Sequence, residues 1–340
     1  MTDASQRDRQ EFGTGLTEVR HEPLASPWRL RLYVAVLCIF PFALILFTFW
    51  WVTTGSYIRH VPFPYIVDTG YGSRLQHADC DVVIDGDSTA LVGVLPRIIE
   101  QRTGLKTCNI AEVAGIKLVN GMMVLDDYLA HNRRPQYLVF VFAPENLTHP
   151  SRWAFVSDFE GWFYRIRFHR DAAFWRRLTQ DPNGTLANAE LAFRDGIEFL
   201  PKRPLPPALA HERDLNGGHV SEPGAPLTRC SGDTIYRMPD PAWLSSLRRT
   251  YGVGGTHVLI DAMPMPPCDE GLPFYRTHLT GLIDNAVDTL PIGDYNSSGR
   301  LHTNELGTAA LSNRIADQLS AILNTPSSHA GATPSPLTNH

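Results

Sequence analysis

The sequence lacks an excess of either charge, and it lacks the side-chain clusters that bind metals or phosphates. Its 30 lysines and arginines nearly balance 35 aspartates and glutamates, which leaves a formal net charge of -5. A nucleic-acid-binding protein is instead expected to have a basic face and a high isoelectric point. No His, Asp and Glu residues show the spacing of metal ligands, and no glycine-rich phosphate loop is present. We therefore expect no metal, no cofactor and no nucleic-acid partner.

Charged residues are absent from the run Leu32–Val52. This run is long enough to cross roughly 30 Å of hydrocarbon at about 1.5 Å per residue. Trp50, Trp51 and Tyr57 lie at its far end, where aromatic side chains favour the membrane–water interface. Pro41 lies inside the run, and membrane helices tolerate proline better than soluble helices do. We therefore expect a transmembrane helix, with a buried core helix as the alternative.

A cleaved signal peptide fits this region poorly. The apolar run and the polar stretch before it are too long, and no A-x-A-like site follows. We expect a single-pass anchor at residues 29–55. Arg29 and Arg31 flank its start, whereas Arg59 lies several residues past its end, so a small charge bias favours a cytoplasmic N-terminus. The expectation is an inner-membrane protein whose remaining chain is extracytoplasmic, that is, periplasmic.

Cysteine is scarce, and no CxxC spacing indicates zinc. Cys38 lies in the predicted span, which leaves Cys80, Cys108, Cys230 and Cys268 in a compartment that permits disulfides. Cys80 and Cys108 each precede a predicted strand, so a bridge between neighbouring strand starts is one interpretation. Four unpaired thiols are the other, and the sequence leaves the pairing open.

The middle of the chain alternates between strand and helix patterns. Short apolar runs predict strands at residues 81–85, 108–111, 137–142 and 257–262. Helical patterns follow at residues 89–103, 117–132 and 307–323. Continuous apolar strands that alternate with helices indicate a parallel sheet buried on both faces. We therefore expect a doubly wound α/β domain, a three-layer sandwich over residues 56–324, with its site at the carboxyl ends of the strands.

Three segments depart from this alternation. Residues 1–28 and 325–340 are polar and lack apolar periodicity, so we expect disordered tails. Residues of about 148–250 form a predicted insertion that caps the sheet. Its first part, 152–178, is rich in aromatics and arginines, and its second part, about 200–240, is rich in proline and glycine. The aromatics fit core packing, a docking surface for a membrane or partner, or contact with a glycan.

Ser88 is the first candidate for chemistry. It lies in the turn Gly86-Asp87-Ser88, at the end of a predicted strand and just before a helix. There the side chain projects from the carboxyl edge of the sheet, near the backbone N–H groups of a helix N-terminus. A serine hydroxyl needs a base to become a nucleophile. The alternative is that Asp87 or Ser88 merely caps the helix.

His302 is the candidate base, because it lies just before the last predicted helix and can reach back over the sheet edge toward the first strand. A solvated loop histidine is the alternative. Asp294, in the same loop, is our first choice for the acid that orients this histidine. Glu305 remains a second choice.

Two further residues are candidates for an oxyanion hole, together with the Ser88 N–H. Gly115, after the second strand, would give a backbone N–H, and Asn146, after the third strand, would give a side-chain amide. Both follow strand carboxyl ends, so they are expected to converge on one edge of the sheet. Turn or capping roles are the alternative for both.

The set Gly86-Asp87-Ser88, Gly115, Asn146 and His302 resembles the four sequence blocks of the SGNH (GDSL) hydrolases, over residues 79–147 and 255–323. The resemblance implies that the serine is the nucleophile, that the glycine and asparagine build the oxyanion hole, and that the histidine is the base.

The sequence departs from this family in two places. The usual acid lies three residues before the histidine, where this chain has Gly299. The third block reads Ala143-Pro144-Glu145-Asn146 in place of the usual Gly-x-Asn-Asp.

A single N-terminal membrane helix looks like the branch of the family that acylates cell-envelope polysaccharides, as the alginate acetylation proteins do. The resemblance implies an O-acyltransferase or esterase that acts through acyl-Ser88 on an exported polysaccharide, beside a multi-spanning membrane O-acyltransferase. The alternative is a catalytically inactive interaction subunit of such a complex, because the usual acid is missing at Gly299.

Overall fold

The computed structural model describes residues 27–60, 70–149, 159–201, 211–222, 224–230 and 234–325. All but the inner ends of the two predicted disordered tails lie outside the described residues.

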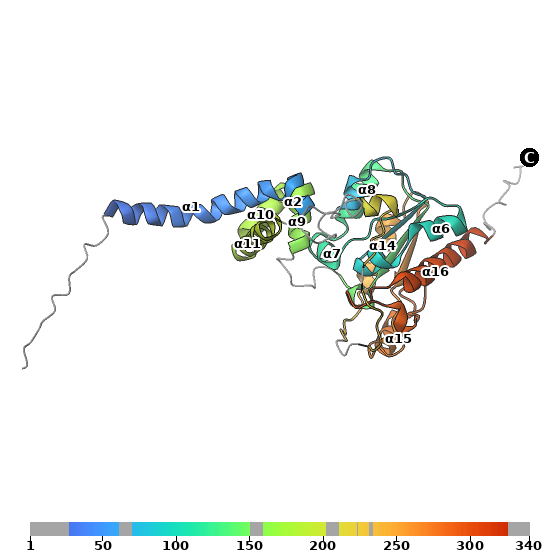
Figure 1. Ribbon diagram of the computed structural model, residues 1–340. Helices are drawn as coiled ribbons and strands as arrows, with labels where there is room; N and C mark the ends of the chain where they lie inside the picture. The colour runs from blue at the N-terminus through green and yellow to red at the C-terminus, as the bar shows by residue number, and fades with distance from the viewer. Residues whose placement is uncertain are drawn as a thin grey trace, which may run out of the picture. The chain divides into compact units, whose positions relative to one another are not determined.

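The helices and strands are shown in Figure 1. In chain order they are α1 (Pro27–Trp51), α2 (Gly55–His60), α4 (Tyr71–Arg74), β1 (Val82–Gly86), α5 (Ser88–Gly93), α6 (Pro96–Thr103), β2 (Thr107–Asn109), α7 (Ala114–Asn120), α8 (Met123–His131), β3 (Tyr137–Phe142), the 3-10 helix η1 (Pro144–Asn146), α9 (Phe159–Phe168), α10 (Ala172–Gln180), α11 (Pro182–Phe199), α13 (Glu212–Leu215), α14 (Pro241–Tyr251), β4 (His257–Ala262), α15 (Leu272–Leu279), the 3-10 helix η3 (Ile292–Asp294) and α16 (Glu305–Leu323).

The chain divides into two compact units, residues 1–44 and 45–340. The described part of the first unit is α1 up to Leu44. By length and composition α1 is able to cross a membrane. Its side chains are mostly exposed, unlike those of the core helix that the sequence left as an alternative.

The second unit contains a four-stranded parallel sheet in the order β2-β1-β3-β4. The connection from β1 leads to one side of the sheet, and β3 returns to the other side of β1. The carboxyl ends of β1 and β3 therefore flank a point where the winding direction reverses, which is where open α/β sheets bind ligands. Ser88 follows β1 at this point, and Asn146 follows β3.

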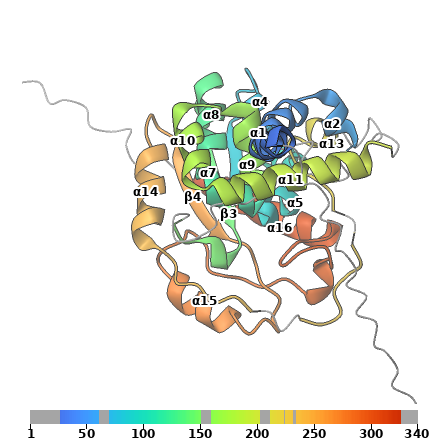
Figure 2. The ribbon, with the colours of Figure 1, turned by 90° about the vertical axis from the view of Figure 1, so that its left-hand side faces the viewer.

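Helices cover both faces of the sheet, as the buried strands predict. On one face, Phe140 and Phe142 contact Tyr251 and Trp243 of α14. On the other face α16 packs against α5 (Figure 2) and against α6 (Figure 1). The sequence placed residues 241–250 in the insertion, but the structure makes α14 part of the sheet's own cover.

The predicted helices differ from the observed ones where the backbone is restricted. The helix expected at 89–103 is broken into α5 and α6 before Pro96, because proline disfavours helical geometry in the preceding residue. The helix expected at 117–132 is broken into α7 and α8 at Gly121, whose φ is 61°. The last helix starts earlier than expected because Asn304 caps it.

Two disulfides lie in the second unit. Cys80 is bonded to Cys108 and Cys230 to Cys268, with Cα–Cα distances of 5.9 and 6.0 Å. The first bond joins the starts of β1 and β2, which is one of the two interpretations that the sequence left open. Cys38 of α1 is a free cysteine.

The carboxyl of Asp261, in β4, is buried beside Gln318 of α16, and this burial can be tested. Burial first, and the charge of Asp284 second, raise the pKa of its carboxyl to about 7. In the unfolded chain this carboxyl titrates near its ordinary pKa of about 3.9. Between these two values the folded protein holds one more proton than the unfolded chain, so stability falls as pH rises from about 4 to about 7 and levels off above that.

Asp261→Asn removes this proton and keeps the shape of the side chain. We expect the free energy of unfolding of the variant to equal that of wild type near pH 4. Between about pH 4 and pH 7, the difference should grow in favour of the variant by up to about 1.4 kcal/mol per pH unit. Denaturant unfolding in detergent at pH 4, 5.5 and 8 measures this. The exposed Asp288→Asn is the matched control. A constant difference between Asp261→Asn and wild type across these pH values would contradict the assignment.

Candidate active site

Asp87 and Ser88 divide two roles that the sequence left to either residue. Asp87 caps α5, since its Oδ1 accepts hydrogen bonds from the backbone N–H of Thr89 at 2.9 Å and from the Thr89 hydroxyl at 2.6 Å. Ser88 is the first residue of the helix and is half-buried. The capping role therefore belongs to Asp87, which leaves the Ser88 hydroxyl available for another contact.

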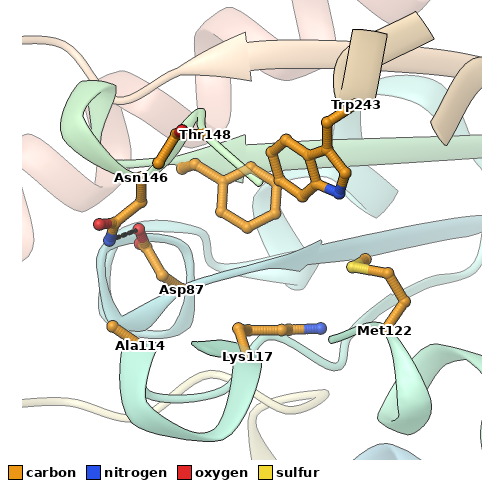
Figure 3. A pocket seen from close by; sticks show the side chains of 8 residues that line it. Asp87, Ala114, Lys117, Met122, Asn146, Thr148 and Trp243 are labelled. Atoms are coloured by element: carbon orange, nitrogen blue, oxygen red, sulfur yellow. Dashed lines mark hydrogen bonds between the residues drawn. The ribbon is translucent and has the colours of Figure 1, made fainter. Parts of the chain in front are cut away.

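The second carboxylate oxygen of Asp87 connects β1 to the end of β3. It accepts a hydrogen bond from the backbone N–H of Ala143 at 2.9 Å and another from the side-chain amide of Asn146 at 2.6 Å. Figure 3 shows the bond between Asp87 and Asn146. One buried carboxylate thus fixes the two turns that carry Ser88 and Asn146.

A glycine is required just before these residues. A Cβ atom on Gly86 would overlap the carbonyl oxygen of Val141 in the neighbouring strand. The glycine therefore lets β1 and β3 approach closely at the edge where Ser88 lies.

His302 contacts Ser88, as the sequence predicts. Its Nε2 lies 3.0 Å from the Ser88 Oγ. The ring is largely buried, and its loop is held because the His302 carbonyl accepts the Asn296 N–H at 2.9 Å. The candidate nucleophile and the candidate base are thus within hydrogen-bond distance, which is the first geometric requirement for general-base catalysis.

The acid on this histidine is Glu222, where the sequence favoured Asp294. An Oε2 atom of Glu222 contacts the Nδ1 of His302. Asp294 lies in η3, and its backbone carbonyl accepts the Asn304 N–H at 2.9 Å. Glu305, the second choice, is exposed on the first turn of α16. Within the described ranges, neither Asp294 nor Glu305 forms a hydrogen bond with the ring.

The glycine at position 299 explains why Glu222, which is distant in sequence, can contact the Nδ1 of His302. A Cβ atom on Gly299 would overlap the Nδ1 of His302. Position 299 therefore lies directly beside the ring nitrogen that needs an acid. Because glycine has no side chain, the carboxylate of Glu222 can occupy that edge of the ring.

The segment that carries Glu222 is fixed on both sides of it. After Glu222, the Leu227 N–H donates to the Tyr295 carbonyl at 2.9 Å, and the Ser297 N–H donates to the Ala225 carbonyl at 3.0 Å. The disulfide of Cys230 attaches the same segment to the loop after β4.

Before Glu222, the segment is held by Arg213 of α13. This buried guanidinium donates to the Ala111 carbonyl at 2.8 Å and to the Glu112 carboxylate at 3.2 Å. Farther along, the Val220 N–H donates to the Leu91 carbonyl of α5 at 3.3 Å. These contacts carry the chain from β2 across α5 to His302.

Two of the three expected oxyanion-hole donors adjoin Asp87. They are the backbone N–H of Ser88 and the side-chain amide of Asn146. No acceptor for the Ser88 N–H lies in the described part of the chain, whereas the next three amides of α5 all bond to Asp87. The Asn146 amide carries two hydrogens, of which one donates to Asp87. Gly115 is the second residue of α7, next to Ala114.

A pocket opens beside Asp87 and Asn146. Its lining residues are Asp87, Ala114, Lys117, Met122, Phe142, Asn146, Thr148 and Trp243. Its cavity volume is about 20 Å³, and its mouth is open to solvent. Figure 3 shows Asn146 and Asp87 at one end and Trp243 and Met122 at the other. The wall is mainly apolar.

Lys117 is the cation of this wall, and the carboxylate of Asp85 neutralises it. Its Nζ lies 2.5 Å from the Asp85 carboxylate, and both side chains are buried. Burial raises the pKa of the Asp85 carboxyl, and the Lys117 ammonium opposes this rise. The pair therefore adds little net charge to the pocket.

Arg300 connects the His302 loop to the turn of Asn146. Its guanidinium lies 2.8 Å from the Glu145 carboxylate and 3.1 Å from that of Asp269. Burial raises the pKa of the Glu145 carboxyl, and Arg300 opposes this rise. These ion pairs hold the loop of His302 and the turn of Asn146 in a fixed relation.

Comparison of the chain with known proteins found no relative. No protein-family model, no curated protein and no solved structure matches the chain. In the part that the structure describes, no group of three or more His, Cys, Asp or Glu side chains is placed to hold a metal ion.

Sequence reasoning missed Glu222 and the second contact of Asp87. Glu222 lies in a stretch that is rich in proline and glycine and has no periodicity, so nothing local distinguishes it from other glutamates. The one usable signal was the glycine at position 299, which requires a carboxylate from elsewhere if His302 is a base.

Glu222→Gln tests the new assignment. The amide keeps the size of the side chain but removes the charge that favours the Nδ1–H tautomer and the imidazolium. We expect the second-order rate of Ser88 labelling by a fluorophosphonate probe to fall by about 100-fold or more. Mass spectrometry of the labelled peptide, followed over time, measures this.

Asp294→Asn is the matched control and should label at nearly the rate of wild type. If Asp294→Asn slows labelling and Glu222→Gln does not, Asp294 is the working acid.

Proposed function

We propose that the chain is a serine-dependent acyltransferase or esterase that forms an acyl-Ser88 intermediate and acts on an extracytoplasmic glycan. The observation that carries the proposal is the continuous contact from Glu222 through His302 to the Ser88 hydroxyl. The same three groups serve both reactions, because only the final acceptor differs.

The contacts from Glu222 through His302 to Ser88 would let the histidine take the proton of the serine hydroxyl. An ionised Glu222 accepts the Nδ1–H of His302, which leaves the Nε2 lone pair facing the Ser88 hydroxyl. As Ser88 Oγ attacks the ester carbonyl, its proton passes to Nε2. The tetrahedral intermediate then expels the leaving alkoxide, which takes the proton back from Nε2. Water or a sugar hydroxyl attacks acyl-Ser88 with the same histidine as base.

The oxyanion of the tetrahedral intermediate would be stabilised by the Ser88 N–H and the second hydrogen of the Asn146 amide. Asp87 holds that amide in place, so little reorganisation is needed when charge develops. The Gly115 N–H remains the third proposed donor.

The pocket beside Asn146 suits the acyl group. Phe142, Trp243 and Met122 give an apolar wall, which fits the carbon end of an acyl chain. Trp243 and Met122 lie at the end of the pocket away from Asn146 (Figure 3), so they would limit the length of the acyl chain. We propose a short acyl group such as acetyl.

Location and substrate follow from the N-terminal helix and the disulfides. We propose that α1 is an uncleaved single-pass anchor with a cytoplasmic N-terminus. Both disulfides fit an oxidising compartment such as the periplasm. An anchored domain there meets envelope polysaccharide. The resemblance to SGNH proteins adds O-acetylation or deacetylation of an exported polysaccharide, and a multi-spanning O-acyltransferase as a partner.

The alternative of an inactive interaction subunit rested on the missing acid at Gly299. Because Glu222 contacts the His302 ring at that edge, the reason for assuming lost activity is removed.

Trapping the intermediate tests the proposal. With p-nitrophenyl acetate in excess, wild type should release p-nitrophenol and carry an acetyl group on the peptide that contains Ser88. Ser88→Ala and His302→Ala should lose both signals, because one lacks the nucleophile and the other lacks the base. Stopped-flow absorbance and peptide mass spectrometry measure these effects.

The exposed Ser245→Ala is the matched control and should react as wild type does. Faster loss of the acetyl group when an oligosaccharide is added would identify a transferase. Folded wild type without acetyl-Ser88 would contradict the proposal.

A further inference from the structure

Helices α9, α10 and α11 pack around the last turns of α1. The Phe49 ring lies 5.3 Å from that of Trp162 and 5.9 Å from that of Phe174, measured between ring centroids. The Trp51 ring lies 5.9 Å from that of Phe193. All these residues belong to the second unit and form a small hydrophobic core of their own.

Helix α11 is held closely against the end of α1. A Cβ atom on Gly196 would reach the ring of Trp51 within 3 Å, so only a glycine permits this approach. The Tyr57 hydroxyl of α2 donates to the Ala192 carbonyl at 3.0 Å. Both contacts fix α11 beside the residues where the apolar run of α1 ends.

Several large apolar side chains on the outer side of this cluster are exposed, beside charged ones. Leu186, Phe193 and Ile197 of α11, and Leu200 directly after its end, follow one another at helical spacing, beside the buried stripe that faces the cluster core. All but Phe193 are exposed. We define the outer apolar face by its exposed large side chains, which are Phe47, Trp50, Trp175, Leu186, Ile197 and Leu200.

We propose that the outer apolar face lies in the interfacial layer of the bilayer that α1 spans. The inference rests on the anchor in the proposed function. Its main support is continuity, since Phe47 and Trp50 belong to α1 itself and α11 packs on the next residue, Trp51. A surface attached to the last turn of a membrane span is at the height of the headgroups.

The side chains on and near the face fit that layer. Tryptophans such as Trp50 and Trp175 favour the interface, because the indole is apolar on its ring and polar at its N–H. The exposed Arg176 and Arg194 lie on the same helices and can extend their charged ends toward headgroups. Acidic and basic residues are mixed on α11, so apolar contact, and not net charge, would drive the binding.

The contact would also orient the active site. Tyr164 of α9 is buried against α7 and α8, and its hydroxyl donates to the Asp127 carboxylate at 2.8 Å. Helix α7 carries Ala114 and Lys117 of the pocket wall. The chain of packed helices therefore connects the pocket wall to the helices that carry the outer apolar face.

A nitroxide label at position 197 tests the proposal in the full chain. The label is attached to Ile197→Cys on a Cys38→Ser background, and the protein is reconstituted in phosphatidylcholine bilayers. Collision rates with oxygen, which concentrates in lipid, are compared with those for a water-soluble nickel chelate. Val253→Cys is the matched control, since Val253 is 46% exposed and Ile197 is 52% exposed. Leu37→Cys reports the span itself.

We expect the ratio of oxygen to nickel collisions at position 197 to be several-fold higher than at 253 and closer to that at 37. A Leu200→Cys label should behave as the label at 197 does. Unchanged labelling of Ser88 by a fluorophosphonate shows that each variant is folded.

Other results overturn the inference. Equal ratios at 197 and 253 would place the face in water. Protection at 197 from both reagents would indicate contact with protein and not with lipid. A low ratio at 37 would show that α1 does not span the bilayer, which refutes the proposed anchor, whereas a high ratio at 37 with a low ratio at 197 refutes the inference alone.

Discussion

The carboxylate of Asp87 is the constraint on which the candidate site depends. It is buried between the ends of β1 and β3, where an unsatisfied charge would be costly. It avoids that cost by accepting four hydrogen bonds, two from Thr89, one from Ala143 and one from Asn146. These bonds cap the helix that starts at Ser88 and orient the amide across the sheet from it. Ser88 and the Asn146 amide, the proposed nucleophile and oxyanion donor, are therefore positioned by one residue.

The rest of the relay comes from segments that are far apart in sequence. His302 reaches Ser88 from the loop before α16, and Glu222 reaches His302 from a segment without regular structure. That segment is ordered by a buried ion pair at one end and by the Cys230–Cys268 disulfide beyond its other end. The irregular segment thus supplies Glu222, the proposed acid, while the end of β1 leads to Ser88, the proposed nucleophile.

Local patterns predicted what local physics determines. Apolar runs located the four strands, and strand ends located Ser88 and Asn146, because parallel strands bring their carboxyl ends to one edge. His302 was found because the last helix covers the first strand. Glu222 was not found, because its position depends on contacts with Asn296, Ser298 and His302 that no spacing encodes. Pro96 and Gly121 break two helices that apolar periodicity alone would extend, because backbone restrictions at single residues override that periodicity.

The most direct test of the account is a crystal structure of the protein after reaction with a phosphonate ester. We expect a phosphorus atom bonded to the Ser88 Oγ and a phosphonyl oxygen within hydrogen-bond distance of the Ser88 N–H and the Asn146 amide. We also expect the Glu222 carboxylate to remain on the Nδ1 of His302. An adduct on another residue, or a different carboxylate on Nδ1, would contradict the account.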